Sequence, residues 1–192
     1  GDTTSIIENM EIYGNVLYTD RYWTVAGGEA PGIFLSVGNP SNVIRNISIH
    51  SNTCGWLGLP CIRIYGVVQG INIRNNIMYD SGMDIGVDDP SQISSNYNLF
   101  FTTDPNAPAR HQAIPWIKEG PHSLIGQNPQ FANYIRHTAW DFHLKPTSPA
   151  INAGSLGPIT PPNPFKDIDG TTRPQGITYD IGAYEFVSGA TP

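Results

Sequence analysis

Three side chains near the middle of the chain have types and spacings that suit acid–base chemistry. Arg63 and Tyr65 stand two residues apart in the apolar segment 62–66, and Asp84 occupies the second position of the similar segment 83–88. An arginine can neutralise the carboxylate of a substrate, and a tyrosine beside it can donate or accept a proton. The alternative without chemistry is a cross-strand ion pair between Arg63 and Asp84, worth about 0.2–1 kcal/mol.

These segments belong to a repeating pattern of short predicted strands. Four cassettes, at 10–15, 47–52, 71–76 and 93–98, begin with apolar residues at alternate positions, or nearly so, and end in an asparagine. The asparagines are 37, 24 and 22 residues apart, and they are Asn15, Asn52, Asn76 and Asn98. A period in the low twenties is typical of a solenoid, in which each unit stacks on its neighbours. An antiparallel sandwich is the alternative, and it does not account for the constant offset of the asparagines.

The pattern predicts three strands per circuit of the chain. After each cassette comes a short strand, as at 16–18, 77–79 and 99–101, and a third strand follows at 33–37, 62–66 and 83–88. Asparagine tolerates the left-handed conformation of a sharp corner, so we expect the asparagines to stack at one corner with their amides bonded. Stacking predicts outward columns Phe34/Arg63/Asp84 and Ser36/Tyr65/Gly86. We interpret a third column, Tyr13/His50/Arg74/Asn96, as a solvated face rather than an anion site.

The repeats resemble the right-handed parallel β-helix of the pectate-lyase-like superfamily, including its asparagine ladder. Segments 141–154, 167–170, 173–174 and 180–186 resemble the C-terminal region of many secreted bacterial β-helix proteins. The resemblance implies an all-β fold. Residues 1–131 would form a right-handed parallel β-helix with an asparagine ladder, and residues 132–192 an irregular capping tail. This fold hosts lyases, hydrolases, epimerases, adhesins and inert fibres, so it does not by itself select a function.

The resemblance also implies where a site would lie. In pectate-lyase-like enzymes the substrate groove runs along one column of stacked strands. Here the corresponding strands, 62–66 and 83–88, carry Arg63, Tyr65 and Asp84, which would then be the catalytic residues. Substrate would be bound by Trp23, Trp56, Phe34 and Asp88. The basic cluster and calcium-binding carboxylates of pectate lyases are absent, as is the three-aspartate arrangement of polygalacturonases.

Two function classes therefore stay open. One is a secreted or surface protein that interacts with polysaccharide, as a relative or part of a lyase or hydrolase. The other is a non-catalytic structural, adhesin or matrix module. The sequence leaves open whether the chain is an enzyme. It predicts neither which sugar the chain would recognise nor which bond an enzyme of this kind would cleave.

Two cysteines and two aspartates form the remaining candidate sites. Cys54 and Cys61 flank a short loop, which predicts a disulfide and an oxidising compartment; two buried thiols are the alternative. Asp167 and Asp169 resemble the start of a calcium loop, but the closing glutamate is missing. The alternative is a turn in which these carboxylates cap backbone N–H groups. We expect no cofactor, with Ca²⁺ at this pair as the exception.

Composition bounds the partners of the protein. The chain has 192 residues and a net charge of −6, which disfavours a nucleic-acid partner. No apolar run reaches the length of about 20 residues that a membrane span needs. The resemblance to secreted β-helix proteins and the predicted disulfide imply a location outside the cell or on its surface. The chain opens close to a predicted strand, which favours missing N-terminal rungs and association with them or with another copy.

Overall fold

Short strands recur along the described chain up to residue 144, and residues 145–189 contain turns and loops without a further strand. The computed structural model describes residues 5–18, 31–36, 41–55, 57, 60–81, 83–103, 118–135 and 139–189. Within these ranges the protein is all-β, and the single helical turn is the 3₁₀ helix Pro90–Gln92. The strands form three parallel sheets and one antiparallel pair. The prediction of an all-β protein with parallel sheets is thereby confirmed.

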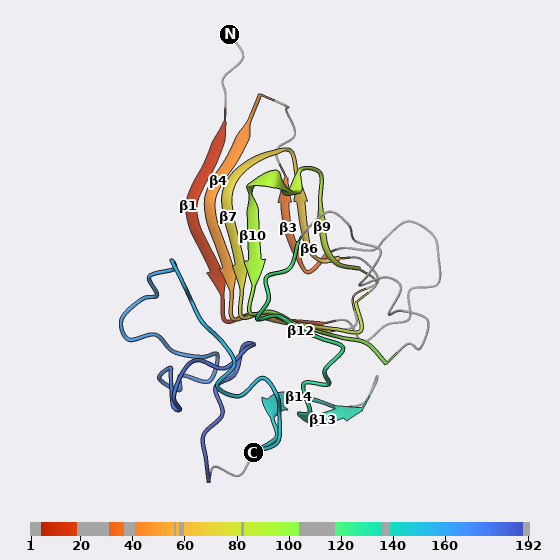
Figure 1. Ribbon diagram of the computed structural model, residues 1–192, viewed down its shortest axis with the longest axis vertical. Helices are drawn as coiled ribbons and strands as arrows, with labels where there is room; N and C mark the ends of the chain where they lie inside the picture. The colour runs from red at the N-terminus through yellow and green to blue at the C-terminus, as the bar shows by residue number, and fades with distance from the viewer. Residues whose placement is uncertain are drawn as a thin grey trace.

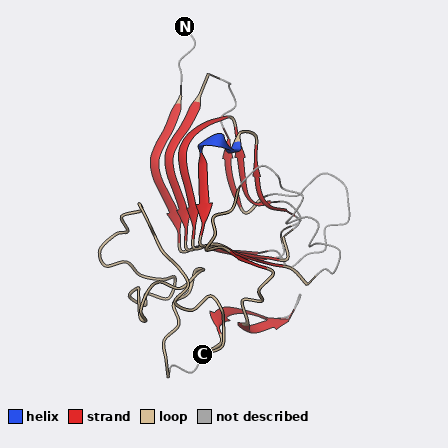
Figure 2. Ribbon diagram, viewed as in Figure 1, coloured by secondary structure: helices blue, strands red, loops and turns tan. Residues whose placement is uncertain are grey.

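Up to residue 101, successive strands go to the three parallel sheets in turn, so each complete circuit of the chain adds one strand to each sheet (Figures 1 and 2). The first sheet has the order β1–β4–β7–β10, with bounds Ile6–Tyr13, Val43–His50, Val67–Arg74 and Ile93–Asn96. The second sheet has the order β2–β5–β8–β11–β12, with bounds Val16–Tyr18, Thr53–Gly55, Ile77–Tyr79, Leu99–Phe101 and Leu124–Ile125. The third sheet has the order β3–β6–β9, with bounds Ile33–Ser36, Pro60–Tyr65 and Met83–Val87.

Alternating apolar residues from all three sheets form the main core. In the first sheet Ile12, Ile49 and Ile73 pair in register along successive strands, and the column ends at Ser95. Ile49 and Ile73 are completely buried. Branched side chains of this kind pack well on a pleated surface, which explains why isoleucine recurs at the inner positions.

The predicted asparagines stack at the corner between the first and second sheets. The side-chain amide of Asn15 donates to Asn52 at 2.9 Å, that of Asn52 to Asn76 at 2.9 Å, and that of Asn76 to Asn98 at 3.0 Å. Each acceptor oxygen also receives the backbone N–H of the preceding asparagine in the series. Ser123 continues the column, because its hydroxyl accepts the backbone N–H of Asn98 at 3.2 Å.

The left-handed residue of each corner is not the ladder asparagine but the residue before it. Gly14, Ser51, Asn75 and Tyr97 have φ between 53° and 67°. This differs from our expectation, and the reason is geometric. The turn needs one left-handed residue, whereas the ladder residue is selected for an amide that can both donate and accept.

The C-terminal tail covers the outer face of the second sheet, below that sheet in Figure 1. Ile77, Tyr79 and Leu99 point outward from β8 and β11 and form a second buried cluster with residues of the tail. The tail partners are mainly Phe131, Phe142, Leu144, Ala150 and Ile181. Three of them come from the antiparallel pair β13 (Phe131–Ile135) and β14 (Ala139–Leu144). The second sheet is therefore apolar on both faces.

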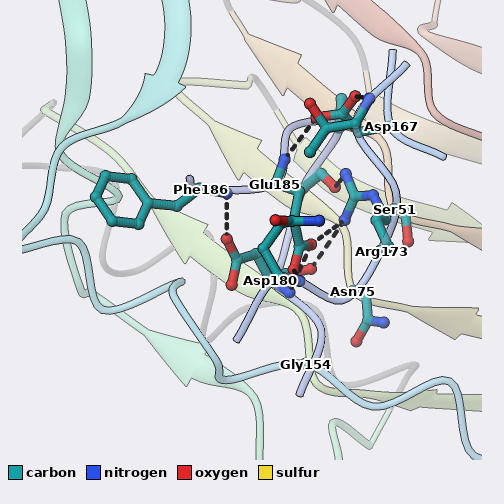
Figure 3. A network of polar contacts seen from close by, with 12 residues as sticks. Ser51, Asn75, Gly154, Asp167, Arg173, Asp180, Glu185 and Phe186 are labelled. Atoms are coloured by element: carbon teal, nitrogen blue, oxygen red, sulfur yellow. Dashed lines mark hydrogen bonds and ion pairs between the residues drawn. The ribbon is translucent and has the colours of Figure 1, made fainter. Parts of the chain in front are cut away.

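A buried ion pair organises the tail (Figure 3). The Arg173 guanidinium lies 3.2 Å from the Glu185 carboxylate, and both side chains are fully buried. Arg173 also donates to the backbone oxygens of Asp180 at 3.3 Å and Gly182 at 2.9 Å. The Asp180 carboxylate accepts the backbone N–H groups of Asn152 and Phe186 at 2.7 and 2.6 Å. The charged residues of the C-terminal motif thus hold its own loops together.

Candidate functional site

The outer face of the third sheet presents an exposed aromatic and cationic cluster. Phe34 on β3 is 52 % exposed, and Tyr65 on β6 is 40 % exposed. Their rings meet edge to face with centroids 5.7 Å apart. The Arg63 guanidinium lies over the Tyr65 ring, 3.8 Å from its centroid. This cluster of Phe34, Arg63, Tyr65 and Asp88 is called the third-sheet face below.

Asp88 is the carboxylate partner of Arg63 on this face. The distance from Arg63 Nη2 to Asp88 Oδ1 is 3.5 Å, and the two side chains are 22 % and 46 % exposed. The other carboxylate oxygen accepts the backbone N–H of Gly66 at 3.3 Å. The guanidinium is therefore held by a stacked ring on one side and a half-exposed carboxylate at its end.

The predicted column that joins Arg63 to Asp84 is wrong. Arg63 pairs with Gly86, two residues further along β9. A Cβ atom on Gly86 would lie 2.7 Å from Arg63 Nη1, so the arginine side chain lies across the glycine. The apolar pattern selects a face with a period of two, and it cannot distinguish registers that differ by two residues. The side chain of Asp84 lies outside the described part of the chain, as do Trp23 and Trp56.

The arrangement suits binding of an acidic, ring-shaped ligand. A guanidinium is permanently charged and bonds well to carboxylates, while exposed aromatic rings offer flat apolar surfaces. Arg63, Tyr65 and Asp88 are all accessible from the same side of one sheet.

The outward column on the first sheet is not a solvated face, which corrects our interpretation of it: Tyr13, Arg74 and Asn96 are partly buried. His50 is completely buried. Its ring stacks on that of Tyr13 with centroids 5.1 Å apart, and the tail residue Phe165 meets it edge-on. Burial and the nearby charge of Arg173 lower the pKa of His50 from 6.5 to about 4. The interpretation failed because the tail, which is remote in sequence, covers this column.

Asp167 behaves as a turn-capping residue. Its Oδ1 accepts the backbone N–H groups of Asp169 and Thr171 at 3.0 and 2.7 Å, and its Oδ2 accepts that of Glu185 at 2.9 Å. Asp169 instead lies next to His143, with 2.7 Å between Asp169 Oδ2 and His143 Nε2. Among the described residues no group of three or more His, Cys, Asp or Glu side chains is arranged to hold a metal ion.

Cys54 on β5 and Cys61 on β6 form a disulfide, with their Cα atoms 5.9 Å apart. Both residues are buried in the main core. The bond ties the second sheet to the third within one circuit of the chain.

Sequence reasoning missed a histidine held between two carboxylates in the tail. His143 Nδ1 lies 2.5 Å from Asp141 Oδ1, and His143 Nε2 lies 2.7 Å from Asp169 Oδ2. Burial lowers the pKa of His143, but the hydrogen bonds to Asp141 and Asp169 outweigh it and hold the pKa above its usual value. The available signal was the spacing of two between Asp141 and His143, which places both side chains on one face of a strand.

Comparison with known proteins adds no relative to this picture: no family model, no curated protein and no solved structure matches the chain. Within the described residues no helix is long and apolar enough to cross a membrane.

Proposed function

We propose that the three parallel sheets are the walls of a right-handed parallel β-helix of the pectate-lyase-like kind. Three observations support this proposal. The chain passes through the sheets in constant order, all pairings between their strands are parallel, and hydrogen-bonded asparagines line one corner. The sequence resemblance of the cassettes points in the same direction.

We propose further that the protein binds acidic polysaccharide through the third-sheet face. The observation that carries this proposal is the stack of the Arg63 guanidinium on the Tyr65 ring beside the exposed Phe34. A uronate carboxylate can replace Asp88 as the partner of Arg63, and an aromatic ring can pack against a sugar ring. Arg63 and Tyr65 are then ligand-binding residues.

A location outside the cell or on its surface fits the same proposal. The Cys54–Cys61 disulfide is typical of oxidising compartments. Polysaccharides rich in uronate are extracellular materials, so a secreted or surface-exposed protein would meet them.

A structural or adhesin module is the competing function, and one observation favours it. Asp88 already neutralises Arg63 at 3.5 Å, and an exposed pair of this kind is an ordinary surface feature. On this alternative the third-sheet face has no ligand.

Calorimetric titration with oligogalacturonates and neutral oligosaccharides separates the two functions. We expect the acidic oligomers to bind, Arg63→Ala to weaken binding by about tenfold or more, and added salt to weaken it as well. Asp88→Asn should strengthen binding, because it removes the carboxylate that competes with the ligand for Arg63.

Arg45→Ala is the matched control. Arg45 pairs with Glu8 at 2.6 Å on the first sheet, so this variant removes a paired arginine, more exposed than Arg63, from another face. Equal binding by the wild type and Arg63→Ala, or binding by neither, favours the structural module.

A further inference from the structure

The tail contains a cavity of about 340 Å³ that is separate from the third-sheet face. Residues of β13 and β14, of the turn 167–171 and of segment 185–187 line it. A volume of this size falls at the lower end of the range of small-molecule sites, about 300–1,000 Å³. The cavity therefore suits a ligand of about one ring.

Most of the cavity surface is apolar. Leu144, Pro146, Phe186 and Val187 line it together with the small side chain of Ala132 on β13. In Figure 3 Phe186 projects away from the Arg173–Glu185 pair, which leaves its ring available to line the cavity. An apolar wall of this kind packs against the C–H face of a ring.

Residues with hydrogen-bond donors and residues with acceptors line the same cavity. Asp169 supplies a carboxylate, Thr171 a hydroxyl and Lys145 an ammonium group. Hydroxyl groups both donate and accept hydrogen bonds, so a mixed set of donors and acceptors matches a polyol better than an ion of one sign. Asp167 and Asp169 on the same wall oppose the entry of an anion.

The polar wall is held in place from two sides. Asp167 caps the turn 167–171 through the backbone N–H groups of Asp169 and Thr171. His143 holds Asp169 at 2.7 Å while Asp141 holds the other ring nitrogen of His143. Both nitrogens of an imidazole can donate only in its protonated form, so a charged His143 orients the Asp169 carboxylate.

From this geometry we propose that the cavity binds a neutral, hydroxyl-rich ligand of about one sugar ring. The apolar residues of β14 and 186–187 pack on one face of the ring. Asp169, Thr171 and Lys145 bond to its hydroxyl groups. This site is independent of the third-sheet face, which has the opposite charge preference.

Saturation-transfer NMR and calorimetric titration test the proposal on the full chain. The probes are methyl α-glucopyranoside and methyl α-galactopyranoside, with glucuronate as the charged counterpart. We expect at least one neutral glycoside to bind and glucuronate to bind about tenfold more weakly or not at all. Absence of binding by both neutral glycosides, or tighter binding by glucuronate, overturns the proposal.

Two variants locate the binding. Ala132→Leu fills the cavity and should abolish binding, whereas Asn133→Leu introduces the same side chain at the neighbouring, exposed position of β13 and should not. Thr171→Val should weaken binding by about tenfold, because it removes one hydroxyl without changing shape.

The failure of this proposal is distinguishable from failure of the acidic-polysaccharide proposal. Arg63→Ala should leave binding of the neutral glycosides unchanged. Loss of that binding in Arg63→Ala, or unchanged binding in Ala132→Leu, shows that the glycosides do not occupy this cavity.

Discussion

Asn76 shows how much of the corner depends on one side chain. Its amide oxygen accepts both the backbone N–H and the side-chain amide of Asn52, at 3.1 and 2.9 Å. Its amide nitrogen donates to Asn98 and to the backbone oxygens of Ile49 and Arg74. Asn76 is buried, so water cannot replace these partners when the side chain is removed.

We expect Asn76→Ala to lower the free energy of unfolding by about 3 kcal/mol, because it leaves several buried polar groups without partners. Urea denaturation of the wild type and the variant measures the difference. Asn72→Ala is the control: Asn72 lies on β7, shortly before this corner, and is partly exposed, so we expect a change within about 0.5 kcal/mol. Equal effects of the two substitutions would contradict the importance of the ladder.

At the scale of elements, short strands need ties between sheets. β5 and β8 have three residues each, so each makes few backbone hydrogen bonds of its own. The Cys54–Cys61 disulfide connects β5 to β6 across a sequence separation of seven residues. The disulfide reduces the number of conformations open to the unfolded chain at this turn.

Removing this bond in a Cys54→Ala/Cys61→Ala variant should cost about 2.5 kcal/mol of stability, as expected for the closure of a loop of this length. Denaturant unfolding of the variant against the oxidised protein gives the value. Alkylation followed by mass measurement gives an independent check, since the oxidised protein should take up no label until it is reduced. Labelling of both cysteines without reductant would contradict the bond.

At the scale of the whole molecule, the tail and the parallel sheets stabilise each other. Thr53 Oγ1 on β5 accepts the backbone N–H of Ala183 at 2.9 Å, and the Asn75 side chain accepts that of Ser155 at 2.9 Å. Gly182 has φ of 107°, and a Cβ atom there would lie 2.6 Å from Ile77 Cδ1. The tail thus approaches the second sheet at backbone distance.

The tail also buries His50 on the first sheet through Phe165, and this burial makes stability depend on pH. The folded-state pKa of His50, about 4, lies below the usual value of 6.5, so the unfolded chain binds the proton more tightly. The corresponding stability is fully present above pH 6.5 and is lost as the pH falls toward 4. Its full size is about 3 kcal/mol, because one pKa unit corresponds to about 1.4 kcal/mol.

The melting temperature of wild type and His50→Phe between pH 7 and pH 4 measures this dependence. Phenylalanine keeps the stack with Tyr13 and Phe165 and carries no proton, so the acid decrease should become smaller. His122→Phe is the control, because His122 is exposed and its ring stacks on Tyr97 rather than on Phe165. Identical acid profiles for His50→Phe and wild type would contradict the assignment.

The local pattern of the sequence determined much of the fold. Alternating isoleucines predict the strands and their inner faces, and the constant offset of Asn52, Asn76 and Asn98 predicts the stacked corner. Both features follow from interactions between neighbouring circuits that repeat the same residues. The C-terminal aromatic residues also indicate that the tail is ordered and packs on the sheets.

Only the tertiary structure decided the register of β9 and the burial of His50. Arg63 faces Gly86 rather than Asp84, and the apolar pattern cannot separate two registers that differ by two residues. His50 is buried by Phe165, which lies more than a hundred residues away in the chain. Burial by so distant a segment leaves no local trace in the sequence, and the approach of Asp169 to His143, from 26 residues further along the chain, leaves none either.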